Sequence, residues 1–298
     1  MFDLLSRLRQ YARLLRQIRE ELLANRLLMG RLLADKARLA GSLREAEFRV
    51  FSQYGDDGII QYLLAHVAVR SASFVEFGVE DYREANTRFL LFNNGWRGII
   101  MDGSARHMAT VRSESWYWQY DFTARDAFIT AENINQLLTD AGFAGPLGLL
   151  SVDIDGNDYW VWRAITVVDP DIVIAEYNAV FGPERAITVP YQPDFVRQKA
   201  HFSNLYFGAS LPALCELATT KGYAFVGCNS AGNNAFFVKD RHLGTLRPLT
   251  AAEGFVNSAY RESRDPTGQL TLLSGERRAD LIRGLPVYNI RTDAVEPF

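Results

Sequence analysis

The stretch that decides the fold is LGLLSVDIDGND, residues 147–158. Residues 147–154 are a near-continuous apolar run, which is typical of a strand buried on both faces of a parallel sheet. Acidic residues stand at the end of this run, and residues 157–165 predict a helix. A buried strand that ends on acids and leads into a helix indicates a βα unit with polar groups at the carboxyl edge of the sheet.

Similar units repeat on both sides of this stretch. The runs that predict further strands are 74–78, 98–101, 116–122, 171–175, 223–228 and 234–238. The segments that predict further helices are 86–93, 131–141 and 210–221. Because the last two strands are separated only by the turn 229–233, they predict an antiparallel hairpin. The whole pattern predicts an α/β, Rossmann-like fold with a mostly parallel, seven-stranded sheet and an antiparallel edge hairpin.

Residues 4–43 carry a separate signal. Leucine and other apolar residues follow an alternating 4-3 spacing there, interrupted at Asn25 and Lys36, which predicts a coiled-coil helix that self-associates. The segment is also rich in arginine, so a basic amphipathic helix on an anionic membrane surface is a second interpretation. Packing on the chain's own body is a third. We therefore expect a coiled-coil helix over residues 1–45 and a catalytic domain over residues 46–298.

Composition limits the class of protein. The net charge is −3, and the positive N-terminal segment leaves an acidic body, which argues against a nucleic-acid partner. No run reaches the roughly 18 apolar residues of a membrane span. The two cysteines, Cys215 and Cys228, do not form a CxxC pair, and two free thiols are typical of a reducing compartment. We expect a cytoplasmic protein, with peripheral contact at the inner face of the membrane as the variant that the basic helix suggests.

Polar residues stand at the ends of five successive predicted strands. In open α/β sheets this carboxyl edge is where ligands bind, so the repetition favours a functional site over a set of unrelated caps. The acids at these ends are Glu76, Asp102, Asp121, Asp153, Asp155 and Glu176.

Several of these segments together resemble a known family. FVEFGV, residues 74–79, resembles the first motif of class I methyltransferases. SVDIDGND, residues 151–158, is similar to the [KS]-x-D-x-[DE]-G-x-[DE] block of FkbM-type methyltransferases, and so, more broadly, are residues 52–58 and 234–238. The resemblance covers about residues 50–240. The run after Gly78 departs from the family pattern because it holds no second glycine.

The resemblance implies S-adenosylmethionine as cofactor. Gly78 lets the backbone approach the amino-acid moiety closely, and Glu76 orients the loop or meets the ammonium group. Asp102 is placed to accept both ribose hydroxyls, and Asp121 to accept the adenine amino group. Asn86 holds the first loop or caps the helix that follows. The full set of expected cofactor-binding residues is Glu76, Gly78, Val79, Asn86, Asp102, Asp121 and Asp153.

The acceptor side allows two mechanisms. Asp155, Glu176 and Asn178 make an oxygen-only set at two neighbouring strand ends, which suits Mg²⁺. A metal there would lower the pKa of the acceptor hydroxyl. In the metal-free alternative, Asp158 or His201 acts as general base. Asp155, Asp158 and His201 are therefore the candidate catalytic residues.

The segment 177–207 has few strand or helix signals and many aromatic residues, so we expect it to form the acceptor site. The functional prediction is an S-adenosylmethionine-dependent O-methyltransferase. Its acceptor would be a small molecule, with a sugar hydroxyl of a glycan or glycosylated metabolite favoured. The alternative is a non-catalytic coiled-coil scaffold with a ligand-sensing Rossmann body. No G-x-G-x-x-G follows the first strand, which disfavours a nicotinamide oxidoreductase. Residues 250–263 predict a short helix, and the chain end predicts a peripheral strand.

Overall fold

A computed structural model describes the backbone of residues 2–298 and the side chains of residues 7, 10, 11 and 13–298. It contains a seven-stranded sheet in the order β3-β2-β1-β4-β5-β8-β7. Strands β1 to β5 of this sheet pair in parallel, and β8 is antiparallel to both β5 and β7. The predicted mixed sheet with an antiparallel hairpin is confirmed. The strands are β1 (Ser73–Phe77), β2 (Arg97–Asp102), β3 (Phe122–Asp126), β4 (Gly145–Val152), β5 (Val168–Glu176), β7 (Tyr223–Cys228) and β8 (Asn234–Lys239).

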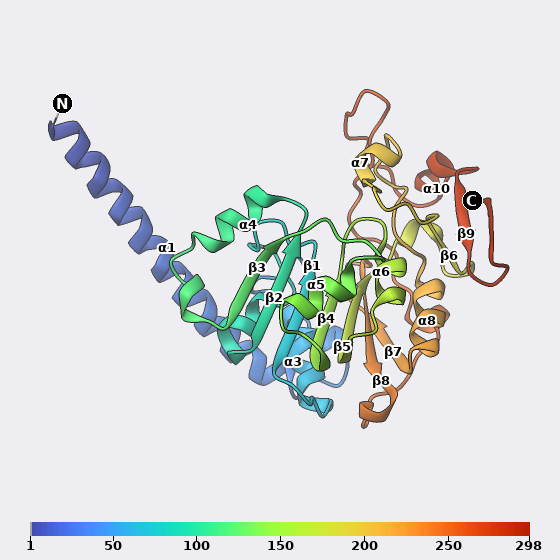
Figure 1. Cartoon of the computed structure of the whole chain (residues 1–298), viewed down its shortest axis with the longest axis horizontal. Helices are drawn as coiled ribbons and strands as arrows, with labels where there is room; N and C mark the ends of the chain where they lie inside the picture. Colours follow the sequence, from blue (N-terminus) through green and yellow to red (C-terminus); the bar gives the residue numbers. More distant parts are fainter. Residues whose placement is uncertain (1) are drawn as a thin grey trace.

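Helices cover both faces of the sheet (Figure 1). One apolar core lies between the sheet and α3 (Asp56–His66), η1 (Leu90–Asn94) and α4 (Ala105–Arg112). The other lies between the sheet and α5 (Ile134–Asp140), α6 (Asp158–Ala164) and α8 (Leu211–Thr220). Strands that are covered by helices on both faces of the sheet have no side exposed to water. This explains why β1 and the second half of β4 are mostly apolar and are buried at every position.

The N-terminal helix α1 (Phe2–Ala37) projects away from the body (Figure 1). Its second half packs on the body through small residues: Ala34 and Ala37 are buried, and a Cβ on Gly30 would come within 2.7 Å of Phe89 and Val50. The heptad seam lies on another face and is exposed, with Met29 66% and Leu32 70% accessible. The helix ends before the predicted residue 43, and Ser42 caps a separate short helix, α2 (Leu43–Ala46). The side chains of the seam residues Leu4 and Leu8 lie outside the described residues.

The third strand begins later than the sequence predicts. Residues 116–122 hold the short helix η2 (Tyr117–Gln119), and the strand begins only at Phe122. Trp116 packs among the rings of Phe92, Phe122 and Tyr82, with centroids 5.0 to 6.3 Å apart. Tyr117 and Tyr120 also pack in this cluster, so the run of aromatic residues resembles a strand in the sequence without forming one. As a result, Asp121 lies at the amino end of β3 and is exposed beside Arg97, not at the carboxyl edge.

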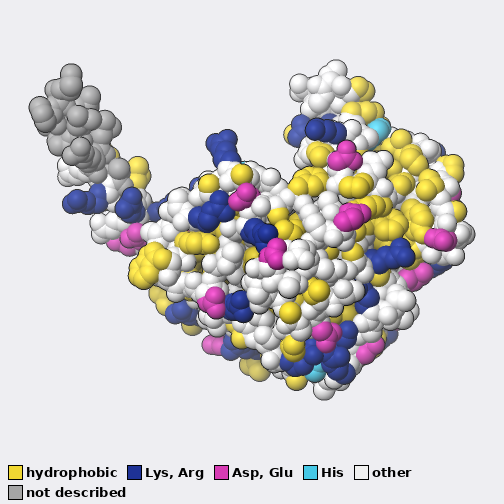
Figure 2. Space-filling view, in the orientation of Figure 1, with side chains coloured by type: hydrophobic (Ala, Val, Ile, Leu, Met, Phe, Trp, Pro, Cys, Tyr) yellow, Lys and Arg dark blue, Asp and Glu magenta, His cyan; other side chains and the backbone are white. Residues whose placement is uncertain are grey.

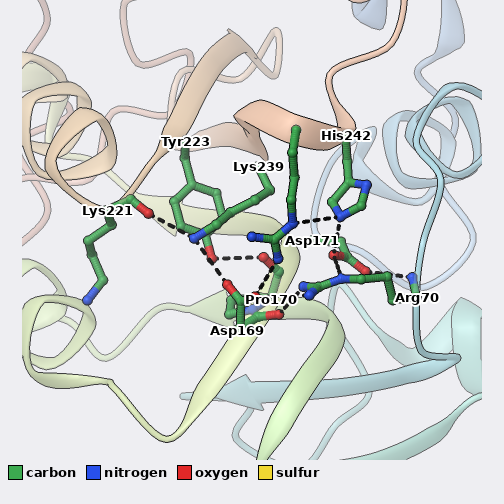
Figure 3. A network of polar contacts seen from close by, with 9 residues as sticks. Arg70, Asp169, Pro170, Asp171, Lys221, Tyr223, Lys239 and His242 are labelled. Carbon is green, nitrogen blue, oxygen red and sulfur yellow. Dashed lines mark hydrogen bonds and ion pairs between the residues drawn. The ribbon is translucent and has the colours of Figure 1, made fainter.

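A network of charges holds the opposite, amino edge of the sheet (Figure 3). Asp171 at the start of β5 is fully buried and accepts hydrogen bonds from the backbone N–H and Nε of Arg70, at 2.7 and 2.6 Å. Asp169 pairs with Arg70, with Lys239 at the end of β8, and with Arg241. The network ties the start of β5 both to the loop before β1 and to the end of β8.

The C-terminal part of the chain adds a peripheral layer. A small antiparallel sheet of β6 (Ile187–Thr188), β9 (Pro286–Asn289) and β10 (Ala294–Pro297) confirms the predicted strand at the chain end. The predicted helix 250–263 is shorter, α9 (Ala251–Gly254), because the capping box at Thr250 starts it and extended chain follows Phe255. The other short elements are η3 (Ala179–Phe181), α7 (Arg197–Ala200), η4 (Asp240–His242) and α10 (Glu276–Ile282). Over the described residues, no helix combines the length and apolarity needed to cross a membrane.

Candidate functional site

Two joined hollows open at the carboxyl edge of the sheet. The smaller, of about 170 Å³, lies at the ends of β2, β3 and β4. The larger, of about 500 Å³, lies at the ends of β1, β4, β5 and the start of β8. Both are lined by Gly78, Glu80, Asp153 and Asp155, so they form one cleft. Figure 2 shows the molecule hollowed between the part that carries α4 and the part that carries α7.

Gly78 brings the two central strands together at the floor of the cleft. Its φ is +70°, and a Cβ there would lie 1.6 Å from the carbonyl oxygen of Asp153. The position therefore requires glycine both for its backbone conformation and for the close approach of the loop after β1 to the end of β4. Val79, the next residue, is buried and lines the larger hollow.

Glu76 organises the loop that follows. Its carboxylate accepts the backbone N–H groups of Asn86 and Thr87, at 2.8 and 3.0 Å, and the Thr87 hydroxyl. Burial raises the pKa of Glu76 to about 7. The Asn86 side chain donates to Ser151 Oγ and so ties the loop to β4. Glu76 was expected to orient the loop or meet the ammonium group, and Asn86 to hold the loop or cap a helix. For both residues, these hydrogen bonds support the role of holding the loop.

Asp102 stands at the rim of the smaller hollow. Its two carboxylate oxygens accept the N–H groups of Glu80 and Ser104, at 2.9 and 2.7 Å. Each oxygen has a second lone pair, so a carboxylate fixed in this way can still accept hydroxyl groups from a ligand. One wall of the hollow is apolar, with Met101, Ala127, Phe128, Ile129, Ile154 and Phe195, and the rest of the lining includes Glu80, Asp153, Asp155 and Asn157. This arrangement suits a flat ring that carries two neighbouring hydroxyls.

Three carboxylates converge in the larger hollow. Asp153, Asp155 and Glu176 each offer one oxygen, and the three oxygens lie within 4.8 Å of one another. Burial, and then the charges of neighbouring carboxylates, raise the pKa values of Asp153 and Glu176 well above their ordinary values. Glu176 Oε2 is buried without a hydrogen-bond partner. Buried like charges so close together favour a bound cation or a shared proton.

Arg197 is the basic residue of this hollow, and the sequence did not reveal it. The guanidinium lies 2.6 Å from Asp155, donates to the Asn204 carbonyl and stacks over Phe207 at 3.8 Å. It comes from α7, inside the segment 177–207, which carries no strand or helix pattern. Tyr54 and Tyr260 are further wall residues that were missed, and their rings stack 6.4 Å apart. The resemblance of residues 52–58 to a family motif was the signal that could have found Tyr54.

Two expected site residues have structural roles instead. Asp158 is buried, and its two oxygens accept the N–H groups of Ile154 and Gly156, at 2.7 and 2.9 Å. It shapes the loop that carries Asp155, so it is not placed as a general base. The Asn178 oxygen caps Val180, and its amide donates to the carbonyls of residues 205 and 207, so it is not a metal ligand.

His201 is also not part of the cleft. Its Nδ1 lies 2.8 Å from Ser203 Oγ, and the residue is absent from the lining of both hollows. Asp121 is excluded from an adenine contact by its place at the amino edge. The residues that the structure does bring together are Glu76, Gly78, Val79, Asn86, Asp102, Asp153, Asp155 and Glu176.

Comparison with known proteins finds only remote structural similarity. No protein-family model matches the chain, and no curated protein matches it significantly. The O-methyltransferase from Bacillus cereus in complex with SAH is 15% identical, with 57% of this chain and 74% of that chain covered and a TM-score of 0.37. The N-terminal domain of EvdMO1 with SAH bound is 10% identical (59% and 74% covered, TM-score 0.36). The DszA carbon methyltransferase is 13% identical (64% and 54% covered, TM-score 0.40). At these values the likeness carries nothing about the chemistry of this chain.

Proposed function

We propose that this chain is an FkbM-like, S-adenosylmethionine-dependent O-methyltransferase that acts on a sugar hydroxyl. The observation that carries the proposal is the two-part cleft, in which an apolar slot with Asp102 at its rim opens directly into a cluster of carboxylates. The slot suits an adenosine, and the acidic hollow suits the cationic end of the same ligand. Bound S-adenosylmethionine supplies an electrophilic methyl group.

We assign the other roles in binding and catalysis to residues of the cleft. Asp102 accepts the ribose hydroxyls, and Gly78 lets the loop after β1 approach the end of β4 at the floor of the cleft. Glu76 and Asn86 keep the loop after β1 in place through the hydrogen bonds described above. Asp155 pairs with Arg197 through one oxygen only, and in the metal-free mechanism we assign the acceptor's hydroxyl proton to its other oxygen. Positioning and deprotonation of the acceptor are then the main sources of rate.

A divalent cation fits the cluster of Asp153, Asp155 and Glu176. Its donors are carboxylate oxygens only, which hard cations such as Mg²⁺ prefer, and the unpartnered Glu176 Oε2 supports a missing ligand. Asp153 takes the place that sequence reasoning gave to Asn178. When bound, the cation would lower the pKa of a hydroxyl held beside it.

A saccharide acceptor is supported by the chemistry of the larger hollow. Amide side chains line it together with the stacked rings of Tyr54 and Tyr260. Sugars present hydroxyls that amides and carboxylates can pair with, and apolar faces that pack on aromatic rings. The amides are Gln53, Asn86, Gln198, Asn233 and Asn234.

We expect Asp102→Ala to weaken binding of S-adenosylmethionine at least about 100-fold, since two hydrogen bonds to a charged group are lost. Isothermal titration of the cofactor into the purified chain measures this directly. Asp121→Ala is the matched control, because it removes an exposed aspartate from the opposite edge and should leave the affinity unchanged. Absence of binding by the unaltered protein would overturn the proposal and favour the non-catalytic scaffold. Equal affinity of both variants would show that Asp102 is not a ligand.

We also propose that α1 self-associates through its exposed heptad seam. The face that packs on the body is a different one, so the seam is available to a second copy. Peripheral contact with a membrane through the same apolar residues is the competing outcome.

Met29→Glu together with Leu32→Glu should weaken self-association at least about 100-fold, because each copy loses two apolar contacts worth about 1.5–3 kcal/mol apiece. Sedimentation velocity over a concentration series gives the measurement. Gln10→Glu with Ala24→Glu adds the same charge at exposed positions off the seam and should leave the oligomer intact. An unaltered protein that is monomeric at all concentrations would contradict self-association and direct attention to vesicle binding.

A further inference from the structure

A second hollow lies between α1 and the body, away from the cleft. It encloses about 740 Å³, and its lining holds more positive than negative side chains. The arginines are Arg16, Arg19 and Arg26 from α1 and Arg83 and Arg88 from the body, and the acids are Glu20 and Glu114. We call it the arginine groove. In Figure 2, basic side chains are also prominent along the described part of α1.

Arg88 is the unusual member of the groove. It is only 7% exposed, yet none of its ion pairs or hydrogen bonds in the described structure involves a carboxylate. One Nη1 bond reaches the Arg83 carbonyl, at 3.2 Å, and Nε is buried without a partner. Burying a guanidinium without an anion is costly. The pKa of Arg88 falls to about 10 because of that burial.

Aromatic rings compensate for only part of this cost. The Arg88 guanidinium lies 4.5 Å from the centroid of Phe51, 5.4 Å from Phe92 and 5.7 Å from Trp116. Cation–π contacts stabilise the charge. A ring face cannot, however, replace an in-plane acceptor or a counter-ion, so the guanidinium keeps a charge that only an anion in the groove would neutralise.

Other guanidiniums of the groove are also available. Arg26 lies 5.0 Å from the ring of Phe51, and neither it nor Arg16 forms an ion pair among the described residues. By contrast, Arg19 pairs with Glu114 at 2.6 Å and thereby bridges α1 and the body. Within the part of the chain that the structure describes, three arginines without counter-ions therefore line one hollow.

We propose that the arginine groove binds the phosphate group of a phosphorylated ligand. A phosphate offers several charged oxygens in a compact group, which matches several guanidinium forks better than a single carboxylate does. The groove is not part of the catalytic cleft. The loop 80–88 separates the two, because Glu84 and Asn86 line the cleft while Arg83 and Arg88 line the groove.

The phosphate could come from a soluble ester or from a lipid headgroup, and both share this chemistry. Isothermal titration with inorganic phosphate and with octyl phosphate tests the soluble source. Co-sedimentation with phosphatidylglycerol vesicles, compared with phosphatidylcholine vesicles, tests the lipid source. All measurements use the full chain at one oligomeric state, checked by sedimentation.

The test variant is Arg16→Gln with Arg26→Gln, since both residues are exposed on α1 and should not affect folding. We expect it to weaken phosphate binding at least about tenfold. The matched control, Arg13→Gln with Arg31→Gln, removes the same charge from exposed positions of the same helix outside the groove and should keep wild-type affinity. Arg88→Lys is the second variant. It keeps the charge but loses the planar fork, and should also weaken binding.

Each outcome decides the proposal. Binding of phosphate or octyl phosphate that only the groove variants lose supports a soluble ester. Binding confined to phosphatidylglycerol vesicles, and lost only in the groove variants, supports a lipid headgroup. Equal losses in groove and control variants would show non-specific charge attraction and overturn the proposal, as would the absence of binding to every probe. Titration of S-adenosylmethionine into the same variants tests the cleft separately. If the cofactor does not bind, the phosphate-binding result can still be interpreted.

Discussion

Replacing Gly78 by alanine is expected to lower the free energy of unfolding by about 3 kcal/mol or more and to abolish binding of S-adenosylmethionine. A Cβ at this position would meet the Asp153 carbonyl oxygen at 1.6 Å and its carbon at 2.8 Å. These are backbone atoms at the end of β4 and cannot rotate away, so β1 and β4 must separate at the floor of the cleft. The positive φ of +70° adds about 1–2 kcal/mol for a residue with a side chain.

Gly95→Ala is the control for this prediction. Gly95 also has a positive φ, +64°, but a Cβ added there would meet no atom within 4 Å. It should therefore show the conformational cost alone, about 1–2 kcal/mol. Thermal or urea unfolding of both variants separates the two contributions. If the Gly78 variant were no less stable than the Gly95 variant, the close contact between the loop after β1 and the end of β4 would be refuted.

Glu176→Gln is expected to reduce methyl transfer about 100- to 1000-fold, the usual scale for losing one electrostatic contact of an active site. It should also abolish binding of Mg²⁺ or Mn²⁺, because the three-carboxylate cluster loses a charged member. Affinity for S-adenosylmethionine should fall less than in the Asp102 variant, since Glu176 is only one of the carboxylates that face the cationic end of the cofactor and the slot is untouched. Titrations of metal and cofactor, together with a methyl-transfer assay once an acceptor is known, give the three readouts.

The same substitution should leave the protein folded. Glu176 is buried among like charges, so a neutral amide of equal shape removes repulsion and should maintain or raise the melting temperature. Glu84→Gln, at an exposed position on the rim of the same hollow, is the matched control and should keep cation binding. A Glu176 variant that still binds the cation with unchanged affinity would exclude the proposed metal site.

The sequence predicted the sheet well where strands are buried on both faces. Residues 74–77 and 147–152 have no polar face, so their apolar runs can hardly be read in another way. The strand at 122–126 was misplaced because it is an edge strand, with only Phe122 and Ala124 buried, and a cluster around Trp116 precedes it. Asp121 was assigned to the wrong edge of the sheet for the same reason. It stands near the end of the predicted strand but directly before the observed one, so it lies at the amino edge and not at the carboxyl edge.

The candidate site was predicted in part for a related reason. Asp102, Asp153, Asp155 and Glu176 follow strands directly, so the parallel sheet itself brings them together. The spacing of residues in the sequence cannot show, however, that the side-chain oxygens of Asp158 and Asn178 accept hydrogen bonds from nearby backbone N–H groups. Nor can it show that Arg197 lies beside Asp155, because that ion pair joins residues 42 positions apart across a segment without pattern.

The charge network of Arg70, Asp169 and Asp171 at the amino edge has a consequence for how this protein could change over time (Figure 3). Asp169 of that network lies seven residues before Glu176 on β5, a span of about 23 Å. Substitutions so far apart have nearly additive effects on stability. The charge network at the amino edge and the residues of the cleft can therefore change separately. Substitutions that adapt the cleft to a new acceptor can lower the stability of the protein, and substitutions at the distant amino edge can restore it.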